Sequence, residues 1–438
     1  MGDAVAGLSV ALVLIPQSIA YASIAGLPPQ VGLFAATLPL IVAAPFVCCP
    51  WLQTGPTAMT SLLTYGALAT LTLNTVEDKV AAAAMLALII GCTRFLLGFA
   101  GLGSFTKLLS RQVILGFTTG AAILIIASQL PKVLGVNQAG DQNHGGVSVA
   151  DTNADAFADA FADTELSADN GHVIIEAFQS FIGLDWFYEA ILIAVATAAF
   201  IYLSRRIHRL FPGIFLAMIV AIIYSAWRQY EGDVVGDLPG GFISLNLDFP
   251  WSEIGSLIFP GIMLAFVGFA EPASISMTLM EEEKREWNPN QELCGGGCAN
   301  LVSGLIGGYP VGGSFSRTSV NHFAGADTSW SGFLTGAAIL SLLWLTPYLK
   351  DLPNAAIGAV VIVAVFRLIK FKEIWQEFRL DKIQGTVAIV ALFATIISAP
   401  RVDIGIAIGA TFGIAAGYWG KRTPQSRQSG DDQHSGGE

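Results

Sequence analysis

The chain has 438 residues, of which 53% are hydrophobic and only 13% are charged, and its formal net charge is −11. Soluble domains carry about 25% charged residues, and nucleic-acid-binding domains carry basic patches, so these values exclude both classes. Apolar runs recur along most of the chain, and many are long enough to cross a hydrocarbon core of about 30 Å. The composition therefore predicts an all-α polytopic membrane protein surrounded by lipid.

Fourteen transmembrane segments are predicted in chain order. The first seven cover residues 4–25, 31–48, 57–73, 79–100, 110–131, 187–203 and 210–229, and the second seven cover 254–280, 290–307, 314–325, 328–347, 354–370, 383–398 and 404–419. With the N-terminus inside, 16 Lys and Arg residues fall on the inner side and 5 on the outer side, and Arg317 lies within a segment, which accounts for all 22. This asymmetry follows the positive-inside rule. It predicts a multi-pass protein of the cell membrane with both termini in the cytoplasm.

Three further stretches of the sequence need an interpretation: the N-terminal apolar residues, an acidic segment and the polar C-terminal residues. Residues 4–15 have no basic residue before them, so they are interpreted as the start of the first segment rather than as a signal peptide. The acidic residues 137–185 are predicted to form a solvated external insertion, with a cation-attracting or partner-binding loop as the alternative. Residues 421–438 are predicted to be a polar cytoplasmic tail.

Cys294 and Cys298 have helical spacing but no accompanying histidine pair, so no metal site is predicted.

Two sequence echoes indicate an internal repeat. IPQSIA at 15–20 matches EPASIS at 271–276, and GPTAMTS at 55–61 matches GSFSRTS at 313–319, at offsets of 256 and 258. Seven segments per half place the second repeat in the membrane upside down, an arrangement typical of secondary transporters. The predicted domains are a first repeat over residues 1–232, an inverted second repeat over 250–420, and the tail.

The third and tenth segments are both short and both follow an extended stretch rich in glycine and proline. A half-helix that begins there points free backbone N–H groups and its positive dipole end into the membrane centre. Two such half-helices that face each other would form an anion site. Close helix packing is the alternative explanation for the small residues. The predicted anion contacts are the first-turn residues of the two half-helices: Thr57, Ala58, Met59, Ser314, Phe315 and Ser316.

Two charged residues lie furthest from either membrane surface. Arg317 lies one turn into the tenth segment, where its guanidinium can donate to an oxyanion in a fork-like geometry. Glu271 lies in the middle of the eighth segment, immediately before Pro272. Charges at this depth are costly and are usually functional. A structural ion pair between Glu271 and Arg317 is the alternative role.

These residues lie within motifs that resemble a known family. IPQSIAYASIAGLPPQVGLFAA (15–36), QTGPTAMTS (53–61), VILGFTTGAAILIIASQL (113–130) and GGSFSRTSVNHFAGADT (312–328) are similar to the SulP anion permeases of the solute carrier 26 family. The similarity covers about residues 1–420. It implies two inverted seven-helix repeats, with a core bundle (segments 1–4 and 8–11) that moves against a gate bundle (5–7 and 12–14) in an elevator-like motion. The family usually carries a cytoplasmic STAS domain after the last helix, and this chain stops before one, which puts in doubt the homodimer contacts attributed to that domain.

The resemblance also implies a site and a function. Gln17 and Tyr21, together with Ser314, Arg317 and the start of the third segment near Ala58, are expected to contact the anion. A glutamate at position 271 resembles the proton-coupled sulfate members, whereas sodium-coupled bicarbonate members are expected to hold an aspartate there. The expected function is import of sulfate or a similar oxyanion by proton symport, with Glu271 as the proton-coupling residue and no cofactor other than the coupling ion.

Three alternatives remain open. Sodium-dependent bicarbonate transport is the alternative within transport, although a monoanion needs less positive charge than Arg317 supplies. An anion channel shares the expected fold and would show non-saturating flux. An enzyme is not predicted, because Ser314 and Ser316 have no nearby base and neither a G-x-S-x-G nor a P-loop pattern occurs.

Overall fold

The computed structural model describes residues 2–73, 75–104, 111–135, 186–207, 210–236, 248–399 and 401–420. Within these residues the regular secondary structure is helical apart from one two-stranded antiparallel sheet and one isolated bridge between Val234 and Pro353. The fold class predicted from composition, an all-α membrane protein, is confirmed. The predicted acidic insertion at 137–185 and the tail at 421–438 lie outside the described residues.

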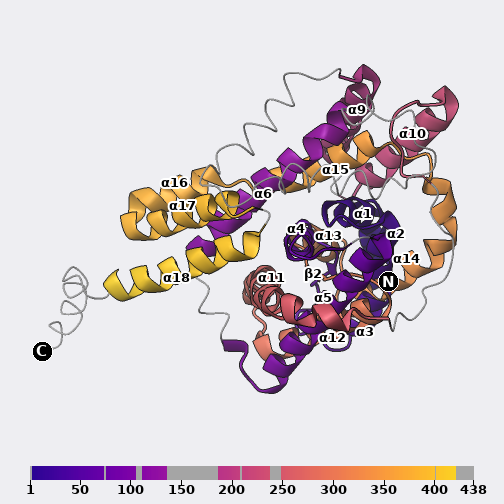
Figure 1. Cartoon of the computed structure of the whole chain (residues 1–438). Coiled ribbons are helices and arrows are strands. Elements are labelled where there is room, and N and C mark those ends of the chain that lie inside the picture. The colour runs from indigo at the N-terminus through magenta and orange to yellow at the C-terminus, as the bar shows by residue number, and fades with distance from the viewer. Residues whose placement is uncertain are drawn as a thin grey trace, which may run out of the picture.

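The helices pack in two groups (Figure 1). One group surrounds the sheet of β1 (Thr54–Gly55) and β2 (Gly312–Gly313), and the other lies beside it along α6. The first group comprises α1 (Gly2–Ile24), α2 (Pro29–Ala35), α3 (Leu38–Ala43), α4 (Ala58–Leu68), α5 (Val76–Phe99), α11 (Ile254–Glu282), α12 (Pro289–Leu305), α13 (Phe315–Phe323) and α14 (Trp330–Leu342). The second comprises α6 (Arg111–Leu134), α9 (Tyr188–Ile207), α10 (Gly213–Arg228), α15 (Asn354–Val365), α16 (Phe371–Leu380), α17 (Lys382–Ile397) and α18 (Val402–Gly420). The two groups have the membership expected for the core and gate bundles.

In the first group, α5 from the first half of the sequence and α12 from the second half pack closely through glycine residues. A Cβ atom at Gly91 of α5 would lie 2.6 Å from the backbone nitrogen of Leu301 of α12. A Cβ atom at Gly297 of α12 would lie 2.7 Å from the backbone nitrogen of Phe95 of α5. Small residues let two helix backbones approach closely, which is how helices associate where lipid supplies no hydrophobic driving force.

Six helical stretches in the described residues are long and apolar enough to span a membrane. Two parts of the chain differ from the predicted segments. Residues 31–48, predicted as one crossing, contain two short helices, α2 and α3, because Pro39 in the first turn of α3 cannot continue the preceding helix. Residues 371–380, left between two predicted crossings, form the amphipathic α16. The total of fourteen crossings stays a prediction.

The β1–β2 pair joins the two sequence repeats at the centre of the first group. Thr54 pairs with Gly313 and Gly55 pairs with Gly312. A short helix follows each strand: α4 has 11 residues and α13 has 9. At about 1.5 Å per residue, neither helix can cross a hydrocarbon core of about 30 Å by itself. The pairing therefore holds the starts of α4 and α13 next to each other.

Candidate anion-binding site

The start of α4 combines a side-chain cap with free backbone donors. The hydroxyl of Thr57 accepts a hydrogen bond from the backbone N–H of Thr60 at 3.1 Å, and the Thr60 hydroxyl accepts one from the Thr57 N–H at 3.2 Å. This reciprocal cap specifies where the helix begins. Ala58 and Met59 follow, and N–H groups in a first turn have no acceptor within their own helix. Of the three residues predicted here, Thr57 already uses its side chain in the cap.

The start of α13 is capped differently. Ser314 occupies the N-cap position in an extended conformation, but its side chain makes no capping bond. Its hydroxyl lies 3.3 Å from that of Ser316 instead. The backbone N–H of Phe315 lies close to the carboxylate of Glu271 and interacts with it electrostatically. A carboxylate of the protein thus lies where the positive end of the helix favours an anion.

Arg317 is the most deeply buried charge of the site, with 0% of its surface exposed. Its Nη1 donates to the Pro56 carbonyl at 2.8 Å and to Oε1 of Gln17 at 3.4 Å. In the part of the chain that the structure describes, Nε and Nη2 have no hydrogen-bond partner. These two atoms form one edge of the guanidinium, the edge that binds a carboxylate or another oxyanion through two parallel bonds. Buried donors without an acceptor are costly, so this edge is suited to a ligand.

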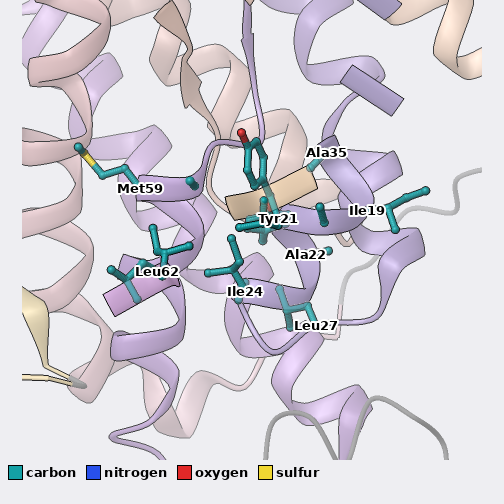
Figure 2. Packing of buried hydrophobic residues seen from close by; sticks show 14 of the residues in the cluster. Ile19, Tyr21, Ala22, Ile24, Leu27, Ala35, Met59 and Leu62 are labelled. Atoms are coloured by element: carbon teal, nitrogen blue, oxygen red, sulfur yellow. The ribbon is translucent and has the colours of Figure 1, made fainter. Parts of the chain in front are cut away.

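The two residues expected on α1 lie against this arginine. Gln17 is buried and accepts its hydrogen bond, as described above. Tyr21 is also buried and interacts electrostatically with both Arg317 and Glu271. Figure 2 shows the Tyr21 ring within the apolar cluster, with its hydroxyl pointing away from Ile24 and Leu27. The structure thus brings Gln17, Tyr21, Arg317 and Glu271 together.

The remaining predicted contacts differ in their exposure. Met59 is 5% exposed and its side chain packs in the apolar cluster of Figure 2, so only its backbone is available to an anion. Phe315 is 61% exposed and Ser316 is also exposed, although both lie at the start of a helix in the middle of the first group. Glu271 is partly exposed. The site therefore has a buried side at Arg317 and an open side at Phe315 and Ser316.

The structure answers the question of an ion pair between Glu271 and Arg317. The two residues interact electrostatically, but the ion pairs found among the described residues do not include them. Arg317 instead binds Pro56 and Gln17, and Glu271 lies close to the start of α13. The two opposite charges lie near each other without neutralising each other by direct contact.

Sequence reasoning missed several residues of the site. The Pro56 carbonyl is the nearest acceptor of Arg317, and carbonyl contacts leave no signal in a sequence. Tyr309 is 0% exposed, its hydroxyl lies 3.0 Å from that of Ser61, and it interacts electrostatically with Arg317. A tyrosine within the glycine-rich stretch before β2 was a usable signal. No group of three or more His, Cys, Asp and Glu side chains in the described ranges could hold a metal ion.

Gly55 is the glycine whose substitution is expected to disturb the site directly. Its φ of +146° is strained for any other residue, and a Cβ atom there would lie 3.5 Å from Nη2 of Arg317. We expect Gly55→Ala to lower stability by about 1–3 kcal/mol and also to weaken anion binding at Arg317. Gly101→Ala is the matched control, because its φ is +75° and no atom lies within 4 Å of the added Cβ. Thermal unfolding and titration of both variants with inorganic oxyanions test this, and equal binding by the two would contradict it.

Comparison with known proteins identifies the family of this chain. The profile described as the Sulfate permease family matches residues 1–391. The chain belongs to the sulfate permease family. "Sulfate transporter 4.1, chloroplastic" of Arabidopsis thaliana is 31% identical over 417 residues, which cover 94% of this chain and 57% of that protein. A "Probable sulfate transporter" of Mycobacterium tuberculosis is 29% identical over 401 residues, which cover 90% of this chain and 66% of that protein.

Solved structures agree with the fold of this permease-family chain. Murine solute carrier 26 family member A9, described as an anion transporter, superposes with a TM-score of 0.78 at 19% identity, covering 96% of this chain and 69% of that one. The transmembrane domain of a cyanobacterial bicarbonate transporter superposes with a TM-score of 0.72 at 21% identity, covering 94% and 97%. At these identities the likeness concerns the fold alone. The chain spans about three fifths of the length of the plant relatives it matches.

Proposed function

We propose that this protein is a secondary active transporter that imports sulfate, or a similar oxyanion, together with a proton. The observation that carries the proposal is the unpaired Nε–Nη2 edge of Arg317, buried beside the starts of two short helices. A tetrahedral oxyanion could accept two bonds from this edge and further bonds from the N–H groups near Ala58 and Phe315. The names of the plant and mycobacterial relatives favour sulfate as that anion.

The charge of the site favours a dianion. A guanidinium edge supplies a full positive charge and two parallel donors, and the first turns of α4 and α13 add two partial positive charges. A monoanion such as bicarbonate needs less compensation, so sodium-dependent bicarbonate transport is the weaker alternative. The similarity to a bicarbonate transporter is one of fold. An aspartate would be expected in place of Glu271 for that function.

The proximity of Glu271 to the Phe315 N–H supports proton coupling. The Glu271 carboxylate interacts electrostatically with the N–H of Phe315, an expected anion contact. A dianion that takes this N–H displaces the carboxylate and adds a repulsive negative charge beside it. Both effects favour protonation of Glu271 as the anion binds. By reciprocity, a proton on Glu271 raises the affinity for the anion.

The two helix groups support an elevator-like movement. The anion contacts Gln17, Ala58, Phe315 and Arg317 all belong to the first group of helices or to the segments beside its sheet. The whole site can therefore move as one body past the second group. With Glu271 protonated and Arg317 matched by a dianion, the loaded group carries less uncompensated charge during that movement. An anion channel would need no such movement and would not saturate.

Uptake of radiolabelled sulfate into proteoliposomes tests the proposal. We expect saturable accumulation against the sulfate gradient when the external pH is lower than the internal pH, with no requirement for sodium. Bicarbonate and dicarboxylates serve as competitors to define the substrate. Uptake that depends on a sodium gradient alone would favour the bicarbonate alternative, and flux that is linear in sulfate concentration would favour a channel.

A further inference from the structure

Two side chains of α13 bind the extended backbone that precedes β1, and the anion contacts described above include neither of them. They belong to Thr318 and Asn321, which are both 0% exposed. The Thr318 hydroxyl accepts a hydrogen bond from the Gln53 N–H at 3.1 Å. The Asn321 amide donates to the Trp51 carbonyl at 3.0 Å. The helix that carries Arg317 is therefore bound along its side to the other sequence repeat.

These bonds continue the pairing of β1 with β2. The sheet pairs Thr54 with Gly313, and the Ser314 N–H then donates to the Gln53 carbonyl at 3.2 Å. In an antiparallel pair the next donor would meet a carbonyl of the partner strand. The chain has become a helix at this point, and helix carbonyls bond within the helix. The Thr318 hydroxyl takes the place of that carbonyl for the Gln53 N–H.

The corresponding residue of the first repeat uses its hydroxyl in another way. Thr60 and Thr318 occupy the same position in the two echoes GPTAMTS and GSFSRTS. The Thr60 hydroxyl accepts from the Thr57 N–H of its own helix start, at 3.2 Å. The Thr318 hydroxyl accepts from the opposite repeat. The start of α4 is thus fixed by a local cap, whereas the start of α13 is fixed by the segment before β1.

A third element joins this contact. The hydroxyl of Ser331, in the first turn of α14, accepts from Nδ2 of Asn321 at 2.8 Å and from Nε2 of Gln53 at 3.4 Å. Gln53 and Ser331 are also buried. A buried hydrogen bond is costly to break because the remaining partner is left without water or another donor. The contact therefore resists rotation of α13 about its axis.

The rotation of α13 decides where Arg317 points. Adjacent residues of an α-helix are about 100° apart around the axis, so the direction of Thr318 fixes that of Arg317. In this orientation Nη1 of Arg317 reaches the Pro56 carbonyl at 2.8 Å, and the Nε–Nη2 edge has no hydrogen-bond partner among the described residues. Two parallel bonds from this edge to an oxyanion require a defined angle of the guanidinium.

We propose that Thr318 is a positioning residue for oxyanion binding. Its hydroxyl holds α13 in the rotation that presents the free edge of Arg317 to the anion, and Asn321 acts with it nearly one turn further on. Thr318 does not itself contact the anion. This inference rests on the proposed function, because it assigns a role within the same anion site.

Titration of purified variants with sulfate tests the positioning role. We expect Thr318→Val to weaken sulfate binding by about fivefold or more, because valine cannot accept from the buried Gln53 N–H. Thr318→Ser keeps the hydroxyl and should restore most of the affinity. Thr395→Val is the matched control. Thr395 is equally buried, but its hydroxyl donates to the Ala391 carbonyl within α17 of the second group, so this variant should bind like the wild type.

A double variant separates positioning from a general loss of stability. If Thr318 acts through Arg317, Thr318→Val should cause no further loss of affinity in an Arg317→Ala background. An equal loss in both backgrounds would overturn the proposal. If Thr318→Val does not fold, Thr318→Cys and Thr318→Ser form a second pair, because sulfur is only a weak acceptor. The Cys variant should bind more weakly than the Ser variant, and equal affinities would overturn the proposal.

The same titrations distinguish this inference from the proposed function. Wild-type affinity in Thr318→Val, together with sulfate binding by the wild type, would overturn the positioning role alone. A wild-type protein that binds neither sulfate nor another inorganic oxyanion would overturn the proposed function, and the positioning role with it.

Discussion

Arg317→Ala is expected to weaken sulfate binding by at least about tenfold. A hydrogen bond to a charged group contributes about 1.5–3 kcal/mol, and tenfold in affinity corresponds to about 1.4 kcal/mol. The variant removes both free donors of the Nε–Nη2 edge and also leaves the Pro56 carbonyl and Oε1 of Gln17 without their donor. Titration calorimetry of the purified protein with sulfate measures the change.

Arg317→Lys is the matched control for this prediction. Lysine keeps the positive charge but cannot supply two parallel donors. We therefore expect an intermediate affinity and a reduced preference for sulfate over monoanions. If Arg317→Ala binds sulfate with an affinity close to that of the wild type, Arg317 does not contact the anion. Equal affinities for the Lys and Ala variants would show that the charge alone contributes nothing.

Glu271→Gln is expected to abolish sulfate accumulation driven by an inward proton gradient. The amide cannot take up a proton, so the linkage between the anion and the coupling ion is lost. The Gln carbonyl can still interact with the Phe315 N–H, because it remains an acceptor. Sulfate–sulfate exchange should therefore persist, with little dependence on pH. Uptake and exchange assays on one preparation of proteoliposomes measure both effects.

Thr278→Val is a suitable control for the Glu271 variant. Thr278 lies on the same helix, two turns further on, is exposed, and its hydroxyl donates to the Ser274 carbonyl. Its replacement should leave both accumulation and exchange unchanged. If Glu271→Gln still accumulates sulfate when only a pH difference is applied, Glu271 is not the coupling residue.

Patterns that are local in the sequence predicted much of the fold. The apolar runs predicted an all-α membrane protein because spanning a bilayer depends on length and hydropathy, which no tertiary contact changes. Pro39 lies in the first turn of a short helix, where it divides the helical structure of residues 31–48, a break that hydropathy alone does not indicate. The amphipathic α16 lies between two predicted crossings, where no helix was predicted. Two echoes at nearly one offset indicated which parts of the halves correspond, and β1 and β2 are the segments that pair.

The candidate site shows where sequence reasoning stops. The motif around residues 312–328 and the depth of Arg317 and Glu271 identified the charged side chains, because a charge within an apolar segment is visible without coordinates. Which groups those charges bind depends on tertiary packing. The Pro56 carbonyl accepts from Arg317 and the Phe315 N–H lies close to Glu271, and both are backbone groups that leave no signal in the sequence. Only the folded chain decides which of Arg317's donors stay free, and it does so by pairing residues 54–55 with residues 312–313, more than half the sequence away.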